Sequence, residues 1–340
     1  MSRKVLVTGA AGFLGANLVR VLLQKGEEVR ALVRPGSDRR GLDGLPVELV
    51  EGDVRDVDSV RRAVAGCSRV FHLAAHHRFW AVHPKEFYET NVRGTGFVMD
   101  ACLAEGVERV VHTSSWCTIG RSSAPADEST PLAPFQPGSP YERTKLHAEQ
   151  IVLRSAERGL PVVVVNPTIV IGPWDGRPTP IGKLLIDFAA GRLPVFVDAR
   201  LNLIHARDVA EGHWLAAERG RVGERYILGN ENRTLASLLE ELTALTGRPA
   251  LRVPIPYRAA WALGAASTVL ANWVTRRPPL LPLEAVELAR RPATFDCAKA
   301  ARELGLPQTP VRVALEEAVG WFQERGFLAA ASGQPAWAQR

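Results

Sequence analysis

The first half of the chain alternates short β-branched runs with longer segments whose apolar residues recur at every third or fourth position. Short apolar runs are typical of strands buried on both faces, whereas the wider spacing is typical of helices that bury one face. The pattern predicts helices at 12–24, 58–65, 86–105 and 141–158, and strands at 5–8, 29–33, 47–51, 69–73, 109–113 and 161–165. Alternating strands and helices predict an α/β fold built on a doubly wound parallel sheet.

The pattern changes after residue 165, where Pro, Gly and Trp become frequent. New helices are predicted at 181–191, 235–246 and 311–322, and the chain is expected to return to the sheet at 203–204 and 225–228. We therefore expect one domain from 1–170 plus 202–229, and a smaller, discontinuous C-terminal substrate domain from 171–201 plus 230–325. The small and polar segment 329–340 is expected to be a flexible tail.

Composition and charge narrow the classes of protein. With 340 residues, 46% hydrophobic and 23% charged, the chain can bury a sizeable core. The formal net charge is +6, but the basic residues are scattered and form no block of like charges. A nucleic-acid partner is therefore not expected, and a basic surface that attracts anionic cofactors is the simpler explanation.

The cysteines and the N-terminus indicate a compartment. Cys67, Cys102, Cys117 and Cys297 lie far apart and include no C-x-x-C pair, so neither a disulfide framework nor a metal site is predicted. The three apolar residues that follow Lys4 are too few for a signal-peptide core. We expect a protein of the reducing cytoplasm.

A glycine-rich turn joins the first strand to the first helix, in Thr8-Gly9-Ala10-Ala11-Gly12-Phe13-Leu14-Gly15. Gly9 permits a sharp bend, Gly12 permits a pyrophosphate to approach the backbone, and Gly15 permits the helix to pack on the strand. The helix N-terminus supplies free N–H groups for phosphates. This context predicts a Rossmann-type dinucleotide site, with Phe13 and Leu14 among its contacts.

The ends of the next strands select the dinucleotide. Arg34 follows the second strand, where an NAD enzyme usually has an acidic residue, so NADP(H) is preferred and NAD(H) remains the alternative. After the third strand, Asp53 can accept from the adenine amino group, next to Val54; a surface aspartate in a turn is the other interpretation. Small residues after the fourth strand leave room for the dinucleotide, and they are Leu73, Ala74 and Ala75.

A tyrosine and a lysine four residues apart form the candidate catalytic pair. Tyr141 and Lys145 share one helical face, and a neighbouring ammonium is expected to lower the tyrosine pKa from about 10. The segment Thr113-Ser114-Ser115 ends the preceding strand at the carboxyl edge of the sheet, where such folds bind ligands. A serine there can hydrogen-bond a substrate oxygen and orient it for proton transfer.

These motifs occur in the order found in a known family. The chain resembles the extended short-chain dehydrogenase/reductases, also grouped as the NAD-dependent epimerase/dehydratase family, over residues 5–170. The resemblance implies that Tyr141 is the acid/base, Ser115 polarises the substrate oxygen and Lys145 tunes Tyr141. It also implies a structural role for Asn91 at the cofactor site and further cofactor contacts at Thr113, Pro167 and Thr168. A homodimer is expected from the same resemblance.

Within that family the chain is most similar to the dihydroflavonol-reductase-like branch, whose bacterial members include those labelled hopanoid-associated sugar epimerases. Segments 202–209 and 223–229 extend the similarity. Sugar-nucleotide enzymes usually carry an arginine after the Gly-Pro turn, and this chain has Trp174-Asp175 after Pro173. That departure favours an apolar substrate, and the residues expected to contact it are His76, Trp80, Trp116, Trp174 and Phe188. Interdomain packing is the alternative role for these aromatic residues.

The resulting hypothesis is an NADPH-dependent reductase of a carbonyl, or a similar unsaturated carbon, in an apolar or aromatic small molecule. An NAD(P)-dependent epimerase of a sugar or sugar-lipid is the alternative. A non-catalytic dinucleotide-sensing protein is a minor one, since such proteins typically lose the Tyr/Lys pair that is present here.

One segment, 259–275, carries no charged residue and is bounded by Arg258 and Arg276. It contains Trp261 and Trp273 but is slightly short for a membrane span. A lid or packing helix is the first interpretation, and peripheral contact with a bilayer is the second.

Overall fold

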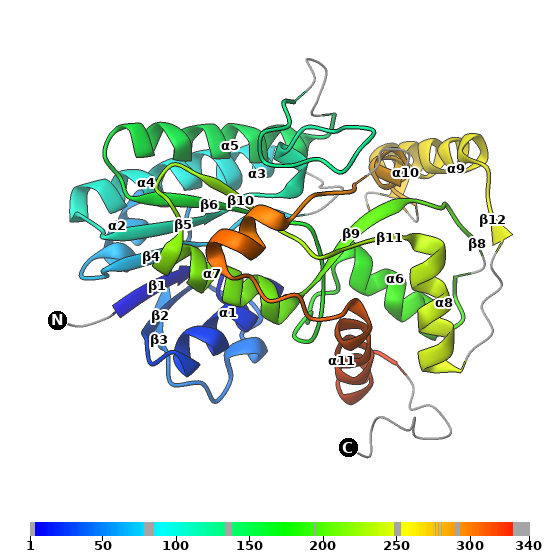
Figure 1. Ribbon diagram of the computed structural model, residues 1–340, viewed down its shortest axis with the longest axis horizontal. Helices are drawn as coiled ribbons and strands as arrows, with labels where there is room; N and C mark the ends of the chain where they lie inside the picture. Colours follow the sequence, from blue (N-terminus) through cyan, green and yellow to red (C-terminus); the bar gives the residue numbers. More distant parts are fainter. Residues whose placement is uncertain are drawn as a thin grey trace.

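The structure is a computed structural model that describes residues 4–77, 85–132, 138–193, 195–247, 253–275, 277, 279, 281–289 and 293–328. Figure 1 shows a helix-covered sheet that occupies one side of the molecule, with a smaller group of strands and helices beside it. The candidate catalytic residues all belong to this larger part: Ser115 follows one of its strands, and Tyr141 and Lys145 lie on one of its helices.

Seven parallel strands form the main sheet, in the order β10-β6-β5-β4-β1-β2-β3. This arrangement confirms the predicted Rossmann-type α/β class, because the chain starts in the middle of the sheet and winds outward in both directions. The strands are β1 (Lys4–Thr8), β2 (Glu28–Val33), β3 (Glu48–Glu51), β4 (Arg69–His72), β5 (Arg109–Thr113), β6 (Val162–Pro167) and β10 (Arg225–Leu228).

Helices cover both faces of this sheet (Figure 1). On one face α1 (Phe13–Gln24) and α7 (Ala206–Arg219) bury residues such as Leu18, Leu22 and Val209. The other face is covered by α2 (Val57–Val64), α4 (Gly94–Glu105) and α5 (Pro140–Glu157). Because helices exclude water from both faces of the sheet, the central strands are almost wholly apolar. The four consecutive valines of β6 are fully buried.

The smaller part contains a second core. A three-stranded sheet has the order β11-β9-β7, and a two-stranded sheet joins β12 to β8. The elements here are β7 (Ile169–Ile171), α6 (Pro180–Ala189), β8 (Val195–Phe196), β9 (Arg200–His205), β11 (Glu231–Thr234), α8 (Leu235–Thr246), β12 (Val253–Pro254), α9 (Tyr257–Leu270), α10 (Leu283–Ala289) and α11 (Val311–Glu324).

Strand β9 corrects one expectation from the sequence. Residues 203–204 do not return to the main sheet; they pair with β7 and β11 instead. Alternation along the strand explains the difference, since Leu203 packs into the core of the smaller part while Ile204 packs into the core beneath the main sheet. Two buried neighbours therefore belong to two different cores. The second predicted return, at 225–228, is confirmed as β10.

Candidate active site

The glycine turn has the geometry that a dinucleotide requires. Gly9 adopts φ +73°, and an added Cβ would lie 2.8 Å from the backbone nitrogen of Ala74 at the end of β4. A Cβ on Gly15 would lie 2.1 Å from the Gly9 carbonyl oxygen, so α1 packs directly on the turn. Leu73 and Ala74 are tied to Thr8 through its carbonyl and its hydroxyl respectively. Ala75 follows immediately, so the small-residue segment runs beside the turn.

The same turn leaves an anion site open. Gly12 is the exposed N-cap of α1, and no acidic residue stands in the first turn of the helix. The first-turn N–H groups have no partner four residues earlier and carry the positive end of the helix dipole. Phe13 and Leu14 occupy that first turn. The residues present therefore fit a dinucleotide pyrophosphate.

Three arginines follow β2, and they differ in what they bind. Arg39 forms an ion pair with Glu51, and Arg40 forms one with Asp38. Arg34 is exposed and makes no ion pair with any residue that the structure describes. Its guanidinium therefore stays available for a phosphate at this end of the site.

Asp53 lies after β3, as the sequence indicated, but its carboxylate is engaged. It accepts hydrogen bonds from the backbone and the guanidinium of Arg55, at 2.7 to 3.1 Å. Burial alone would raise the Asp53 pKa, but these bonds hold it below its ordinary value. Val54 is buried against Gly94 at the start of α4. An adenine amino group would thus share Asp53 with Arg55.

Asn91 joins two walls of the site. It lies in the π-helical turn η2 (Glu89–Arg93) and is 1% exposed. Its side-chain oxygen accepts from the backbone nitrogen of His76 at 2.6 Å, and its amide donates to the His76 carbonyl and to the Thr144 hydroxyl. Because Thr144 lies on α5 beside the catalytic pair, Asn91 fixes the end of β4 against that helix.

The start of α5 positions the candidate catalytic pair. Ser139 is the N-cap and forms a reciprocal capping box with Glu142, and Pro140 occupies the first helical position. The S-x-x-E spacing and the proline are sequence signals of a helix start that our sequence analysis did not use. They fix the first turn of α5, so Tyr141 and Lys145 project together toward the end of β5.

Lys145 is held at the carboxyl end of β5. Its ammonium donates to the carbonyl of Thr113 at 2.6 Å, and the side chain is almost fully buried. Burial lowers the Lys145 pKa to about 8. The hydroxyl of Thr113 is bonded to His213, which secures the strand end that carries this carbonyl. Pro167 ends the neighbouring β6 and Thr168 follows it, and the Thr168 backbone N–H donates to the Leu228 carbonyl.

The two adjacent serines have different partners. Ser114 donates to the buried carboxylate of Glu149, within a network that includes Asn166. Ser115 caps the short helix η3 (Trp116–Thr118), accepting from the backbone of Cys117 at 3.4 Å, and its hydroxyl lowers the Tyr141 pKa. This division supports the choice of Ser115 over Ser114 as the residue facing substrate.

Burial dominates the electrostatics of the tyrosine. It raises the Tyr141 pKa above the ordinary value, with a further increase from Cys117, while the Ser115 hydroxyl acts in the opposite direction. The Lys145 ammonium points to the Thr113 carbonyl, so the expected lowering of the Tyr141 pKa by lysine is not seen in this arrangement. A phenol that keeps its proton suits a proton donor.

The expected substrate residues do not form one wall. The ring centroids of His76 and Phe87 are 4.5 Å apart, and those of Trp116 and Phe295 are 6.0 Å apart. Phe188 is buried in the core of the smaller part. Trp80 lies outside the described residues. Near the catalytic tyrosine, the ring of His77 is edge-on to Tyr141 at 5.1 Å.

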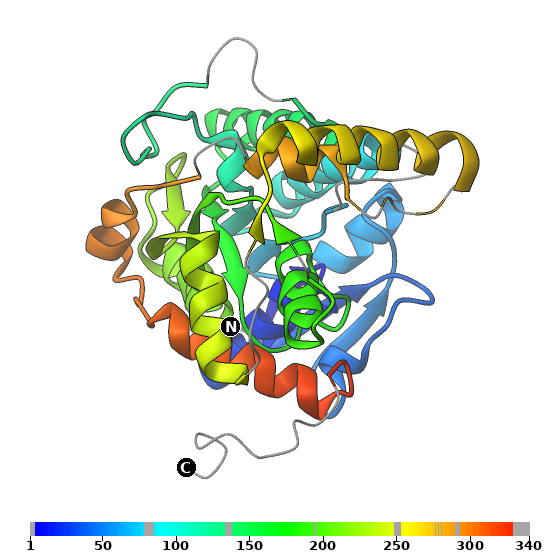
Figure 2. The same ribbon diagram turned by 90° about the vertical axis from the view of Figure 1, so that its right-hand side faces the viewer.

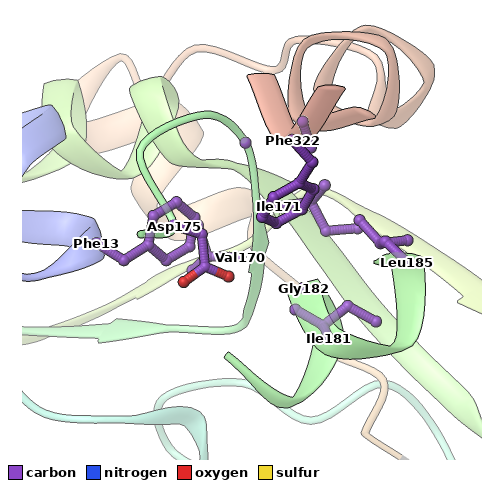
Figure 3. Close-up of a pocket in the computed structure, with 10 residues that line it drawn as sticks. Phe13, Val170, Ile171, Asp175, Ile181, Gly182, Leu185 and Phe322 are labelled. Carbon is purple, nitrogen blue, oxygen red and sulfur yellow. The ribbon is translucent and has the colours of Figure 1, made fainter. Parts of the chain in front are cut away.

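Trp174 lies between the two parts of the molecule. It has φ +74°, and its ring is covered by Arg20 at 3.4 Å and, from the other part, by Arg325 at 5.5 Å. Stacking of guanidinium groups on indole offsets the cost of a left-handed backbone. The next residue, Asp175, lines a small crevice with Phe13, Ile171 and Phe322 (Figure 3).

Comparison with known proteins identifies the family. A model described as the NAD dependent epimerase/dehydratase family matches residues 5–229. The chain is 41% identical over 325 residues to "Sterol demethylase protein B" of Methylococcus capsulatus, covering 95% of this chain and 99% of that one. It is 41% identical over 332 residues to a dihydroflavonol 4-reductase-like protein of Synechocystis sp., covering 95% of each chain.

Solved structures agree with the fold. The structure titled "Crystal structure of gox2253" has a TM-score of 0.86 and 38% sequence identity, and the match covers 96% of this chain and 100% of that one. Similar proteins named as reductases and others named as epimerases both occur, and NAD is bound in several neighbouring structures. The chain belongs to the NAD-dependent epimerase/dehydratase family, the extended short-chain dehydrogenase/reductases, and is an NAD(P)-dependent oxidoreductase.

Proposed function

We propose that this protein uses NADPH to reduce a carbonyl, or a similar unsaturated carbon, in an apolar or aromatic small molecule. The observation that carries the proposal is the arrangement of Ser115, Tyr141 and Lys145 around the carboxyl end of β5. The Ser115 hydroxyl hydrogen-bonds the substrate oxygen, and the Tyr141 phenol donates the proton that this oxygen needs. When bound, NADPH supplies the hydride for the carbon.

The site suits the reductive direction. Burial keeps the Tyr141 phenol protonated, and a protonated phenol is the form that can donate. The Lys145 ammonium lies one helical turn from Tyr141 and can hold ribose hydroxyls of the dinucleotide. With the Lys145 pKa near 8, the ammonium is the main form at neutral pH.

The absence of an arginine after Pro173 supports the proposed substrate class. Trp174 and Asp175 stand in place of the arginine that sugar-nucleotide enzymes of this family usually carry. The Trp174 ring stacks on Arg20, and the Asp175 carboxylate accepts from Thr179. The similarity to a protein named for sterol demethylation supports an apolar ring system over a sugar nucleotide. The preference for NADP(H) rests on the unpaired Arg34.

Location and assembly belong to the same proposal. Four free cysteines, all buried, and a need for NADPH support a cytoplasmic enzyme. A homodimer stays a prediction from the family resemblance.

A panel of carbonyl compounds tests this function. We expect purified protein to oxidise NADPH with alicyclic or long-chain ketones and to leave UDP-sugars unchanged. The alternative is an epimerase, which the family and several similar proteins favour. It predicts conversion of a sugar substrate without net NADPH oxidation, and that result would replace the reductase proposal.

A further inference from the structure

One helix presents its large apolar side chains to solvent. Ten large hydrophobic residues of the described chain are exposed, and six of them lie on α9 and the π-helical turn η4 (Ala271–Thr275) that continues it. Trp273 is 79% exposed and Val274 is 70% exposed. The six residues, which we call the α9 face, are Trp261, Leu263, Val269, Leu270, Trp273 and Val274. Figure 2 shows α9 along the outer edge of the molecule.

The buried side of the same helix carries small and polar residues. Ala260, Gly264 and Ala271 are buried, and an added Cβ on Gly264 would lie 3.3 Å from both Leu283 and Val286 of α10. The hydroxyls of Ser267 and Thr268 accept backbone hydrogen bonds from the chain that leads into α10. A helix of a water-soluble protein normally buries its large apolar residues, so α9 has the opposite arrangement.

Charge around the α9 face suits an anionic surface. Arg258 and Arg277 are exposed at its two ends, and no acidic residue occurs between them. Tryptophan is favoured where hydrocarbon meets lipid headgroups, and arginine is favoured against anionic headgroups. No helix in the described part of the chain has the length and apolarity needed to cross a bilayer.

Helix α9 packs on α10, and a charge on α10 interacts with charges in the first turn of α5. The α10 helix that α9 packs on contains Glu284, whose pKa is raised to about 7 by burial and then by the charge of Glu142. The charge of Arg143 acts in the opposite direction and lowers the Glu284 pKa. Since Glu142 and Arg143 follow Tyr141 directly, Glu284 of α10 is within electrostatic range of the first turn of α5.

We propose that the α9 face seats the protein on an anionic lipid bilayer. A second copy of the chain fits less well, because an antiparallel pair about a two-fold axis would place Arg258 of one copy opposite Arg277 of the other. Lipid contact goes beyond the proposed reaction, and vesicle binding is measured without any enzymatic turnover. Failure of the lipid proposal can therefore be told from failure of the proposed function.

Flotation with vesicles tests the proposal. Wild-type protein should float with phosphatidylcholine vesicles that contain phosphatidylglycerol, and less with phosphatidylcholine alone. The double variant Leu270→Ser/Val274→Ser should partition at least about tenfold more weakly, because each side chain loses apolar burial in lipid. The matched control is Leu49→Ser/Val222→Ser, which changes two exposed residues outside the α9 face and should float like wild type.

Two outcomes would overturn the proposal. One is wild-type protein that stays with the soluble fraction at low ionic strength. The other is a dimer that sedimentation velocity shows dissociating in the Leu270→Ser/Val274→Ser variant, which would assign the face to a second copy. Quenching of wild-type tryptophan fluorescence by brominated lipid gives a reading that needs no variant: quenching is expected, and its absence contradicts lipid contact.

Discussion

Helices α5 and α9 place polar and apolar residues in opposite ways. Helix α5 buries Lys145 and Glu149, and each has a defined partner, in the Thr113 carbonyl and the Ser114 hydroxyl. Helix α9 buries alanine and glycine and exposes tryptophan. Burying charge is costly unless every group is paired, and exposing large apolar area is costly unless something covers it. Both exceptions point to function: chemistry at α5 and an external surface at α9.

Removing the phenol at the start of α5 should have the largest effect. Tyr141→Phe keeps the ring against His77 but loses the proton donor, so we expect kcat to fall by about 10³-fold or more while NADPH affinity stays within a few-fold. Steady-state kinetics and a fluorescence titration of NADPH would measure both. Tyr88→Phe, at an exposed tyrosine, is the control. A variant within tenfold of wild-type kcat would remove Tyr141 from the mechanism.

The glycine turn should tolerate added volume far less than an open helix surface. In Gly15→Ala the new Cβ would meet the Gly9 carbonyl oxygen at 2.1 Å, so the free energy of unfolding should fall by about 3 kcal/mol and dinucleotide binding should weaken. Gly96→Ala on α4 is the matched control, because no atom lies within 4 Å of its added Cβ. Denaturant unfolding of both variants gives the comparison, and equal stabilities would refute the packing argument.

Cofactor choice should depend on Arg34, which forms no ion pair with any residue in the described part of the chain. Arg34→Ala should weaken NADPH by about tenfold or more through loss of a phosphate contact, with NADH nearly unchanged. Arg40→Ala is the control, because Arg40 is paired with Asp38. Dissociation constants for both dinucleotides decide the matter. Equal losses for NADPH and NADH would leave no basis for NADP(H) selectivity.

A buried carboxyl with an incomplete set of partners should make the stability of the protein depend on pH. Asp175 has one oxygen bonded to Thr179 and another without a partner among the described residues. Burial raises its pKa from 3.8 to about 6. The folded state thus keeps a proton that the unfolded state releases, and stability falls as pH rises from about 4 to 6.

Asp175→Asn should remove that dependence. As pH rises from 4 to 8, the free energy of unfolding of the wild type should fall by about 2 kcal/mol more than that of the variant. Urea unfolding at both pH values measures the difference. Parallel pH profiles of wild type and variant would show that Asp175 does not titrate in this window.

The sequence predicted what local rules decide. The glycine turn, the seven strands of the main sheet and the Tyr141–Lys145 pair all depend on short spacings, and the main sheet was confirmed. The pairing of β9 was predicted wrongly, as a return to the main sheet, because strand partners are non-local. Residue type alone could not predict that Phe188 is buried in the core of the smaller part, or that the Trp174 ring stacks on an arginine. For α9, only the exposed fractions distinguished a surface from a packing helix.

Transfer of a labelled hydride tests the central claim most directly. With NADPH carrying deuterium at both positions of nicotinamide C4 and an accepted ketone, the reductase account predicts one deuterium in each product molecule and one NADP⁺ formed per product. Mass spectrometry of the product and absorbance of the dinucleotide measure the two quantities. Product without deuterium, formed with no net oxidation of NADPH, would contradict the account.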